Sequence, residues 1–306
     1  MDSRPSIQAE QRQSPIQGLE LLARQLVEGF ITGLHKSPFH GFSVEFAEHR
    51  LYNPGQSTRH LDWKVYARTD RLYTRQYAEE TNLRCLLMID ASSSMFYPKE
   101  SKAKIQFSVQ AAAAIGWLLH RQRDAIGLCV FDDQIRMLTP VKSSKSGLDK
   151  IFNVLEQLTE NPDQPHRTDT AGIIHEVAEK IHRRSLVVLF TDMLDAEADA
   201  EPIFNALQHL KHNHHEILLF HVYDGKTEHE FEFENRPHEF IDNETGEKIK
   251  LNPGEIRNTF RSEQESRHKA IEAKCHQLKI DLIDADVNKG YLPVLQAYLI
   301  KRARMN

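Results

Sequence analysis

Three short polar segments could carry chemistry, because each lies where a predicted strand ends or a predicted helix begins. DASSS (90–94) overlaps the end of the apolar run LRCLLMID, and TD (191–192) closes the apolar run SLVVLFTD. TDT (168–170) comes just before a predicted helix. In open α/β sheets, ligands bind at the edge formed by the carboxyl ends of the strands. We therefore expect the three segments to meet at one edge of a sheet and to form a binding site.

The spacing of Asp90, Ser92 and Ser94 indicates a metal site. Alternate residues of an extended loop point the same way, so these side chains can converge on one point. Carboxylate and hydroxyl oxygens are hard ligands, which suit Mg²⁺ or Mn²⁺ better than Zn²⁺. Since the serines carry no charge, a bound ion would still seek an anionic oxygen from outside. The competing interpretation is an ordinary loop with helix-capping residues. Three such segments in the right order favour the metal site.

Strands that alternate with helices are predicted to position these segments. Continuous apolar runs, typical of strands buried on both faces, predict strands at 83–90, 125–132, 135–141, 185–192, 216–224 and 279–286. Amphipathic or Ala-rich patterns predict helices at 101–122, 145–158, 171–182, 200–212, 254–277 and 290–304. This order predicts an α/β fold with a doubly wound, mostly parallel, Rossmann-like sheet covered on both faces.

The beginning of the chain has a different pattern. Residues 1–16 are predicted to be a disordered tail, and 17–34 an amphipathic helix. Residues 38–84 contain β-rich pieces such as FSVEF, KVYAR and RLYTRQYAE, which predict a small β-rich segment. We therefore divide the chain into a tail (1–16), an N-terminal helix with a β-rich accessory segment (17–84), and a main domain (85–306).

Residues 225–252 predict a β insertion in the main domain. Acid and aromatic residues alternate in EFEFE (230–234), and a turn at 243–246 precedes a second apolar face. A three-strand antiparallel insertion apart from the main sheet fits this pattern. Its acidic face would meet a basic partner surface through Glu228, Glu230, Glu232 and Glu234, and deletion of 228–250 should leave folding and magnesium binding intact. The alternative is an edge hairpin, a β-hairpin packed on the nearest helix.

An ordered set of aromatic, basic and turn residues precedes the main domain: Arg50-x-Tyr52-x-Pro54-Gly55, Arg59-x-x-Asp62-Trp63-Lys64-x-x-Ala67-Arg68, Leu72-Tyr73-x-Arg75 and Glu79. This set resembles the signature of the bacterial family catalogued as domain of unknown function 58, and the resemblance runs from Phe42 to the end of the chain. Family members often have acidic residues where this chain has Gln56-Ser57, so a charge-based role of that turn does not carry over. We expect the block 52–75 to dock near the metal loop and to shape the partner surface.

The polar segments at 90–94, 168–170 and 191–192 also resemble the metal-ion-dependent adhesion site of von Willebrand factor type A domains. The resemblance implies that Ser92, Ser94 and Thr168 donate hydroxyl oxygens to Mg²⁺ (or Mn²⁺). Asp90 and Asp192 would bind the ion directly or through water. Asp169 would be an acid at a helix N-terminus, and Thr170 would lie behind the ligands.

The same resemblance implies a function without catalysis, so the chain is not predicted to be an enzyme. A partner protein would supply an Asp or Glu to the metal. Members of the family are thought to work with MoxR-type AAA+ ATPases, so this chain would be an adaptor in the assembly or activation of other proteins.

Two other functions stay open. A Mg²⁺-dependent phosphoryl hydrolase would use Asp90 as its nucleophile, but it needs an acid at the position of Ser92 and a lysine near Thr191, neither of which is evident. A structural scaffold with a metal-free loop would bind no Mg²⁺. The chain has no GxxxxGK[ST] phosphate loop, so it is not itself an ATPase.

The composition of the chain narrows the classes of partner and of site that remain to be considered. A formal net charge of −5 over 306 residues gives no electrostatic case for a nucleic-acid partner. The three cysteines, Cys85, Cys129 and Cys275, have no CxxC spacing, which favours buried free thiols in a reducing compartment.

The histidines near residue 212 lack a cysteine or carboxylate to complete a zinc site, so they are better interpreted as residues of a helix end: His209, His212, His214 and His215. Without a signal peptide or a long apolar run, a cytoplasmic location is expected, with possible peripheral association with a membrane complex.

Overall fold

The computed structural model describes residues 19–25, 27–28, 46–51, 63–77, 83–159, 169–193, 200–241, 247–290 and 292–305. The chain divides into two compact units, Leu34–Asn82 and a larger unit that joins Met1–Gly33 to Leu83–Asn306. No helix in the described part of the chain is both long enough and apolar enough to cross a bilayer.

The smaller unit contains a two-stranded antiparallel sheet of β1 (Phe46–Leu51) and β2 (Tyr73–Tyr77). The expected strand at KVYAR is wrong, because these residues belong to α2 (Trp63–Thr69). Lysine, alanine and arginine are good helix formers, and the Thr69 hydroxyl donates to the Val65 carbonyl at 2.9 Å. Residues 52–62 lie outside the described residues, so the docking of the block 52–75 stays a prediction.

The larger unit is built on a six-stranded sheet of the predicted α/β type. Its strand order is β10-β7-β6-β3-β4-β5, and only the edge strand β5 runs antiparallel to its neighbour. The strands are β3 (Arg84–Asp90), β4 (Ala125–Phe131), β5 (Ile135–Leu138), β6 (Leu186–Thr191), β7 (Glu216–Tyr223) and β10 (Asp281–Asp286). The chain moves from β3 to β4 on one side and later returns to place β6 on the other side. Ligands bind at such a switch point in doubly wound sheets.

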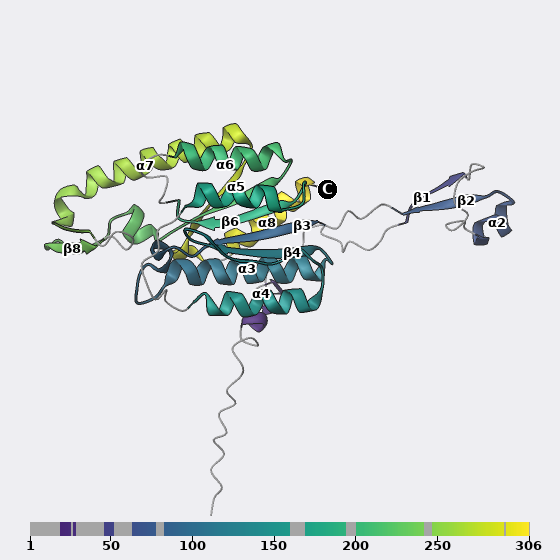
Figure 1. Cartoon of the computed structure of the whole chain (residues 1–306), viewed down its shortest axis with the longest axis horizontal. Coiled ribbons are helices and arrows are strands. Elements are labelled where there is room, and N and C mark those ends of the chain that lie inside the picture. Colours follow the sequence, from purple (N-terminus) through teal and green to yellow (C-terminus); the bar gives the residue numbers. More distant parts are fainter. Residues whose placement is uncertain are drawn as a thin grey trace, which may run out of the picture. The chain divides into compact units, whose positions relative to one another are not determined.

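Helices cover both faces of this sheet, as Figure 1 shows for α5, α6 and α7 on one side and α3 and α4 on the other. The helices are α3 (Ala103–Arg121), α4 (Lys145–Gln157), α5 (Thr170–Lys180), α6 (Glu201–His212), α7 (Pro253–Leu278) and α8 (Leu292–Met305). Along β3, Leu87 and Ile89 belong to the core under α3, while Leu86 and Met88 belong to the core under α5 and α6. Because both faces are covered, the strand reads as a continuous apolar run in the sequence.

The helix near the N-terminus belongs to the larger unit, whereas the sequence pattern grouped it with the β-rich segment. Ala23 and Val27 are buried in the same core as α3 and α4. A cavity of about 310 Å³ lies between this helix and helices α3 and α4, and its lining includes Leu22, Val109 and Glu156.

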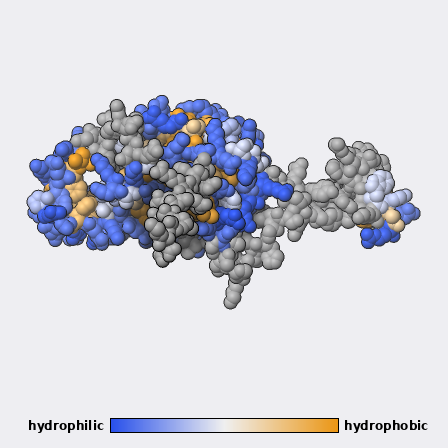
Figure 2. Space-filling view, turned by 90° about the horizontal axis from the view of Figure 1, so that it is seen from below, coloured by the Kyte–Doolittle hydropathy of each residue, from blue (hydrophilic) through white to orange (hydrophobic). Residues whose placement is uncertain are grey.

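The segment after β7 differs from the expected three-strand insertion. Gly225–His229 forms one turn of π-helix (η4). Among the described residues of the segment, only β8 (His238–Ile241) and β9 (Lys248–Leu251) pair, as an antiparallel hairpin. Residues 230–234 are not a strand, because Phe231 has a φ of 50° and turns the chain out of an extended path. Figure 2 shows apolar side chains gathered at the end of the larger unit where this hairpin lies, and Ile241 and Ile249 are exposed there.

Helix α7 holds this segment through its arginines and its aromatic side chains. The Arg257 guanidinium donates to the carbonyls of Phe231 and Phe233 at 3.1 and 2.8 Å. The ring of Phe231 is buried and lies 4.4 Å from that of Phe260, centroid to centroid. The segment therefore packs on the nearest helix, as the edge-hairpin alternative expected.

Candidate metal centre

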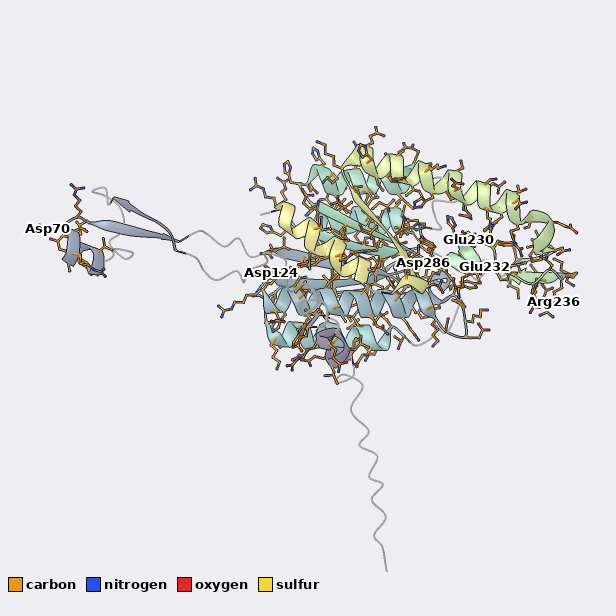
Figure 3. The ribbon with its side chains drawn as sticks, turned by 180° about the vertical axis from the view of Figure 1, so that it is seen from behind. Asp70, Asp124, Glu230, Glu232, Arg236 and Asp286 are labelled. Atoms are coloured by element: carbon orange, nitrogen blue, oxygen red, sulfur yellow. The ribbon has the colours of Figure 1, made fainter. Side chains whose placement is uncertain are left out.

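The polar segments at 90–94 and 191–192 meet at the carboxyl edge of the sheet. Asp90 ends β3 and Asp192 follows β6, the neighbouring parallel strand. Asp90, Ser92, Ser94 and Asp192 are all buried. Figure 3 labels one residue at each end of the parallel strands: Asp286, the last residue of β10, marks the carboxyl ends, and Asp124, just before β4, marks the amino ends. The buried polar cluster lies at the end where a doubly wound sheet binds ligands.

Hydrogen bonds fix the orientation of the Asp90 carboxylate. Its Oδ1 accepts from the Ser92 backbone N–H at 2.9 Å, and its Oδ2 accepts from the Thr191 hydroxyl at 2.8 Å. The Thr191 hydroxyl oxygen in turn accepts from the Met193 N–H at 3.1 Å. The end of β6 therefore orients the carboxylate at the end of β3.

The two serines converge as the spacing predicted, but through a turn rather than a fully extended loop. Ser92 has extended backbone angles, and a short 3-10 helix, η2 (Ser93–Phe96), begins immediately after it. The hydroxyl oxygens of Ser92 and Ser94 lie 3.0 Å apart. Two adjacent ligands of an octahedral Mg²⁺ ion are separated by about 2.9 Å when each lies about 2.05 Å from the ion. The pair therefore has the spacing of two oxygens on one ion.

The electrostatics of the cluster indicate a shortage of positive charge. Burial, together with the nearby negative charge of Asp192, raises the pKa of Asp90 to about 7. Hydrogen bonds from Ser92 and Thr191 oppose this shift but do not cancel it. A cation close to Asp90 would favour the ionised carboxylate and so oppose the raised pKa.

Lys104 and Glu228 belong to the same cluster, although the sequence pattern placed neither of them at the site. The Lys104 ammonium is fully buried and donates to Asp192 Oδ2 at 2.9 Å and to Glu228 Oε1 at 2.6 Å. Glu228 Oε2 accepts from the Asp224 N–H at 2.7 Å. The expectation of an outward-facing Glu228 is therefore wrong, because its carboxylate is used inside the molecule. The expected absence of a lysine near Thr191 is wrong as well.

The pKa values of the two missed residues reflect this pairing. Burial alone would lower the pKa of Lys104, but the charges of Asp192 and Glu228 outweigh it and raise the pKa. Burial raises the pKa of Glu228 despite the nearby ammonium. The sequence did contain an indication for Lys104, because residues 104, 108 and 111 recur at helical spacing and share the buried face of α3. Glu228 had no comparable signal, because its position depends on the π-helical turn after β7.

The third segment lies at the end of β4, next to Asp132. The Asp169 N–H donates to the Asp132 carbonyl at 3.3 Å, and Asp169 Oδ1 accepts from the Gly172 N–H at 2.9 Å. Asp169 is thus the N-cap of α5, which confirms the predicted acid at the start of that helix. Thr170 is buried in the first turn of α5. Thr168 lies outside the described residues, so its ligand role stays a prediction.

The described residues fit a hard divalent cation. Carboxylate and hydroxyl oxygens are the donors that Mg²⁺ prefers. Three carboxylates and one ammonium leave two uncompensated negative charges when all are ionised, which a divalent ion would balance. The Lys104 ammonium donates to Oδ2 of Asp192, so the chain itself holds one oxygen of that carboxylate.

The histidines near the end of α6 do not gather at one point. His209 Nδ1 lies 3.1 Å from His175 Nδ1, whereas buried His215 accepts from the Ser185 N–H through its Nδ1 at 3.2 Å. Burial lowers the pKa of His215, so this ring is a neutral part of the structure. The cysteines are thiols as predicted, because all three are buried and none forms a disulfide.

Comparisons with known proteins give a family but no activity. A family model described as "Protein of unknown function DUF58" matches residues 48–271. Uncharacterized protein Mb1516 of Mycobacterium bovis and uncharacterized protein Rv1480 of Mycobacterium tuberculosis are 28% identical to this chain over 176 residues. The matched region is 58% of this chain and 55% of each relative, so the chain spans about half the length of these curated relatives.

Solved structures show a weaker likeness. The conserved hypothetical protein BatB from Bacteroides thetaiotaomicron has a TM-score of 0.44 and 11% identity, over 73% of this chain and 100% of that one. An aerotolerance-related membrane protein from Bacteroides fragilis has a TM-score of 0.43 and 14% identity, over 70% and 98%. Since the family model covers more than half of the sequence, the chain belongs to the DUF58 family.

Proposed function

We propose that this chain is a von Willebrand factor type A-like module that binds a partner protein through a divalent metal ion. The ligands would be Asp90, Ser92, Ser94, Thr168 and Asp192, around Mg²⁺ or Mn²⁺. One observation carries the proposal: buried carboxylates from the ends of β3 and β6 lie with two serine hydroxyls 3.0 Å apart at the switch point of the sheet.

The chemistry of these donors suits recognition better than catalysis. The ion, when bound, would act as an electron-poor centre that accepts an anionic oxygen from outside. Thr191 and the Ser92 N–H hold Asp90 in one orientation, and Lys104 holds one oxygen of Asp192. Neutral hydroxyls contribute much of the donor set, so Mg²⁺ alone should bind weakly. A partner's Asp or Glu should tighten that binding, because the two binding events are thermodynamically linked.

The proposed partner is a MoxR-type AAA+ ATPase, which this chain would serve as an adaptor in the assembly or activation of other proteins. Family resemblance supports this part of the proposal. The test is co-purification of the full chain with the MoxR-type ATPase of its own organism, in Mg²⁺ and in EDTA. Wild type should retain the ATPase only in Mg²⁺, and Asp90→Ala should lose it in both. Equal retention by wild type and Asp90→Ala would exclude a metal bridge.

Metal binding itself is tested by calorimetry with MgCl₂. Wild type should give a saturable isotherm, and Asp192→Asn should abolish it. Asp133→Asn is the matched control, because Asp133 is exposed and pairs with Arg136 at 3.3 Å. If wild type and Asp192→Asn give the same isotherm, the ligand assignment is wrong. If wild type gives no isotherm, the metal-free scaffold is the better description.

A phosphoryl hydrolase is the second candidate, and Lys104 is the observation that favours it. A lysine ammonium does lie at the cluster, bonded to Asp192. It is fully buried and shared by two carboxylates, however, and the position two residues after Asp90 is still a serine. A screen of aryl and sugar phosphates with Mg²⁺ distinguishes the two functions. Turnover that disappears in Asp90→Asn would favour the hydrolase.

A further inference from the structure

Three side chains outside the candidate magnesium cluster gather near the same edge of the sheet. His221 lies on β7, Asp284 on β10 and His268 on α7. Each offers a ligand atom, and these atoms all lie within 4.8 Å of one another. His221 and Asp284 are register partners on neighbouring parallel strands, so their side chains leave the same face of the sheet. Helix α7 packs on that face and adds His268.

The distances and ring orientations suit coordination. His268 Nε2 lies 3.4 Å from Asp284 Oδ1. Two ligands of a tetrahedral zinc ion are about 3.3 Å apart when each lies about 2.0–2.1 Å from it. The rings of His221 and His268 are nearly parallel, 21° apart, with centroids separated by 5.9 Å. The 4.8 Å limit on the separation of the ligand atoms exceeds this spacing by about 1.5 Å, so a side-chain movement of at most about that size would bring the third ligand to bonding distance.

His221 also has an unmet polar requirement. Its Nδ1 is buried and has no hydrogen-bond partner among the described residues. A buried ring nitrogen without a partner costs free energy, and a metal or a proton donor would remove that cost. The Asp284 side chain is 48% exposed and that of His268 is 26% exposed. The cluster is thus open to solvent on one side, which leaves an entry path and room for a water ligand.

We propose that His221, His268 and Asp284 form a site for a divalent transition-metal ion such as Zn²⁺. Two imidazoles and one carboxylate are a borderline-soft donor set, which suits Zn²⁺ rather than Mg²⁺. The ion would join α7 to β7 and β10, three elements that meet here only in the folded chain. This site contains none of the proposed magnesium ligands, so it does not depend on the proposed function.

Calorimetry with ZnCl₂ on the full chain tests the site, after prior treatment with EDTA and its removal. Wild type should bind Zn²⁺ at this site, and Asp284→Asn and His268→Gln should each weaken the binding more than about tenfold, since loss of a second-shell partner alone costs 10–100-fold. Asp284 is half exposed, so Asp284→Asn is expected to fold even if a histidine variant does not. His276→Gln, an exposed histidine on the same helix, is the matched control and should bind Zn²⁺ as wild type does.

Two further measurements separate this site from others. Co²⁺ in place of Zn²⁺ should give visible absorption bands in wild type that Asp284→Asn loses and Asp90→Asn keeps. The pair His175 and His209 is the competing surface site. If His175→Gln removes zinc binding while Asp284→Asn leaves it intact, the proposal is overturned. It is also overturned if neither variant changes the isotherm, or if wild type binds no Zn²⁺.

Discussion

The Asp90 cluster and the His221 cluster lie near each other, yet they solve the problem of buried polar groups differently. Thr191, which donates to Asp90, is the register partner of His221 on the neighbouring strand. In the first cluster, Lys104 supplies an internal positive charge to two carboxylates. In the second, a ring nitrogen of His221 stays without a partner among the described residues. The comparison teaches that adjacent positions on one sheet edge can carry donor atoms of different chemistry, which is why we propose a different metal for each cluster.

The two clusters also respond oppositely to pH. Asp90 has a raised pKa, so the folded state holds its proton more strongly than the unfolded state does. His221 has a lowered pKa, so the folded state holds its proton more weakly. As pH rises from about 4 to 6.5, Asp90 therefore lowers the stability of the fold, whereas His221 raises it. The following predictions test this contrast, beginning with the largest expected effect.

Lys104→Met should destabilise the metal-free protein most. It leaves Asp192 and Glu228 without their buried ammonium, and removing one partner of a buried ion pair costs about 3–5 kcal/mol. Urea unfolding in EDTA measures the loss. Mg²⁺ should restore part of it, because the ion would take over the missing positive charge. Lys150→Met is the control, since Lys150 is exposed on α4, and it should stay within about 0.5 kcal/mol. If both variants lose the same free energy of unfolding, the Lys104 ammonium does not stabilise the carboxylates of the cluster.

Asp90→Asn should remove a stability loss that wild type suffers as pH rises. Between the ordinary value of 3.8 and about 7, folded Asp90 keeps a proton that the unfolded chain releases, so stability falls across this window. The full effect is on the order of 4 kcal/mol. Unfolding at pH 4, 5.5, 7 and 8 in EDTA measures it. Mg²⁺ should reverse the trend in wild type, because the ion needs the carboxylate. If Asp90→Asn loses stability with rising pH as wild type does, another group causes that loss.

His221→Gln should have the opposite signature in EDTA. Burial, helped by the positive charge of His268, lowers the pKa of His221 to about 4, against the opposing influence of Asp284 and Asp192. Wild-type stability from this group is complete above pH 6.5 and is lost as pH falls toward 4, by up to about 3 kcal/mol. The variant should lack this acid-side loss. If the two proteins lose stability in parallel below pH 6.5, His221 is not the responsible group.

Glu228→Gln should cost less, about 1–2 kcal/mol, because glutamine keeps an acceptor for the Asp224 N–H but loses the charge next to Lys104. Glu232→Gln, an exposed change in the same segment (Figure 3), should have almost no effect. Thermal unfolding of the two variants makes this comparison.

Deletion of 228–250 should be harmful rather than neutral, since it removes both Glu228 and buried Phe231. A deletion variant as stable as wild type would show that the segment is independent of the core.

The sequence predicted the sheet and its helices because burial on two faces leaves a local record. The runs that became β3, β4 and β6 are apolar without a break, and α4 and α6 show an apolar stripe. Local patterns failed where a short segment depends on distant contacts. KVYAR became a helix, and the alternation at 230–234 was overridden by Phe231 in a left-handed conformation, with Arg257 holding the carbonyls of this segment.

The convergence of Asp90, Ser92 and Ser94 followed from the sequence alone, because the three lie within five residues at the end of β3 and the start of the turn that follows it. The sequence also determined that Asp169 begins a helix, through the local N-cap that it forms with Gly172. Only the tertiary structure decided that Lys104 and Glu228, 124 residues apart, pair with each other at that site. It alone brought His221, His268 and Asp284 together from two strands and a helix. Such pairs leave no periodic trace, because their proximity comes from the order of strands in the sheet and from the packing of α3 and α7 on its two faces.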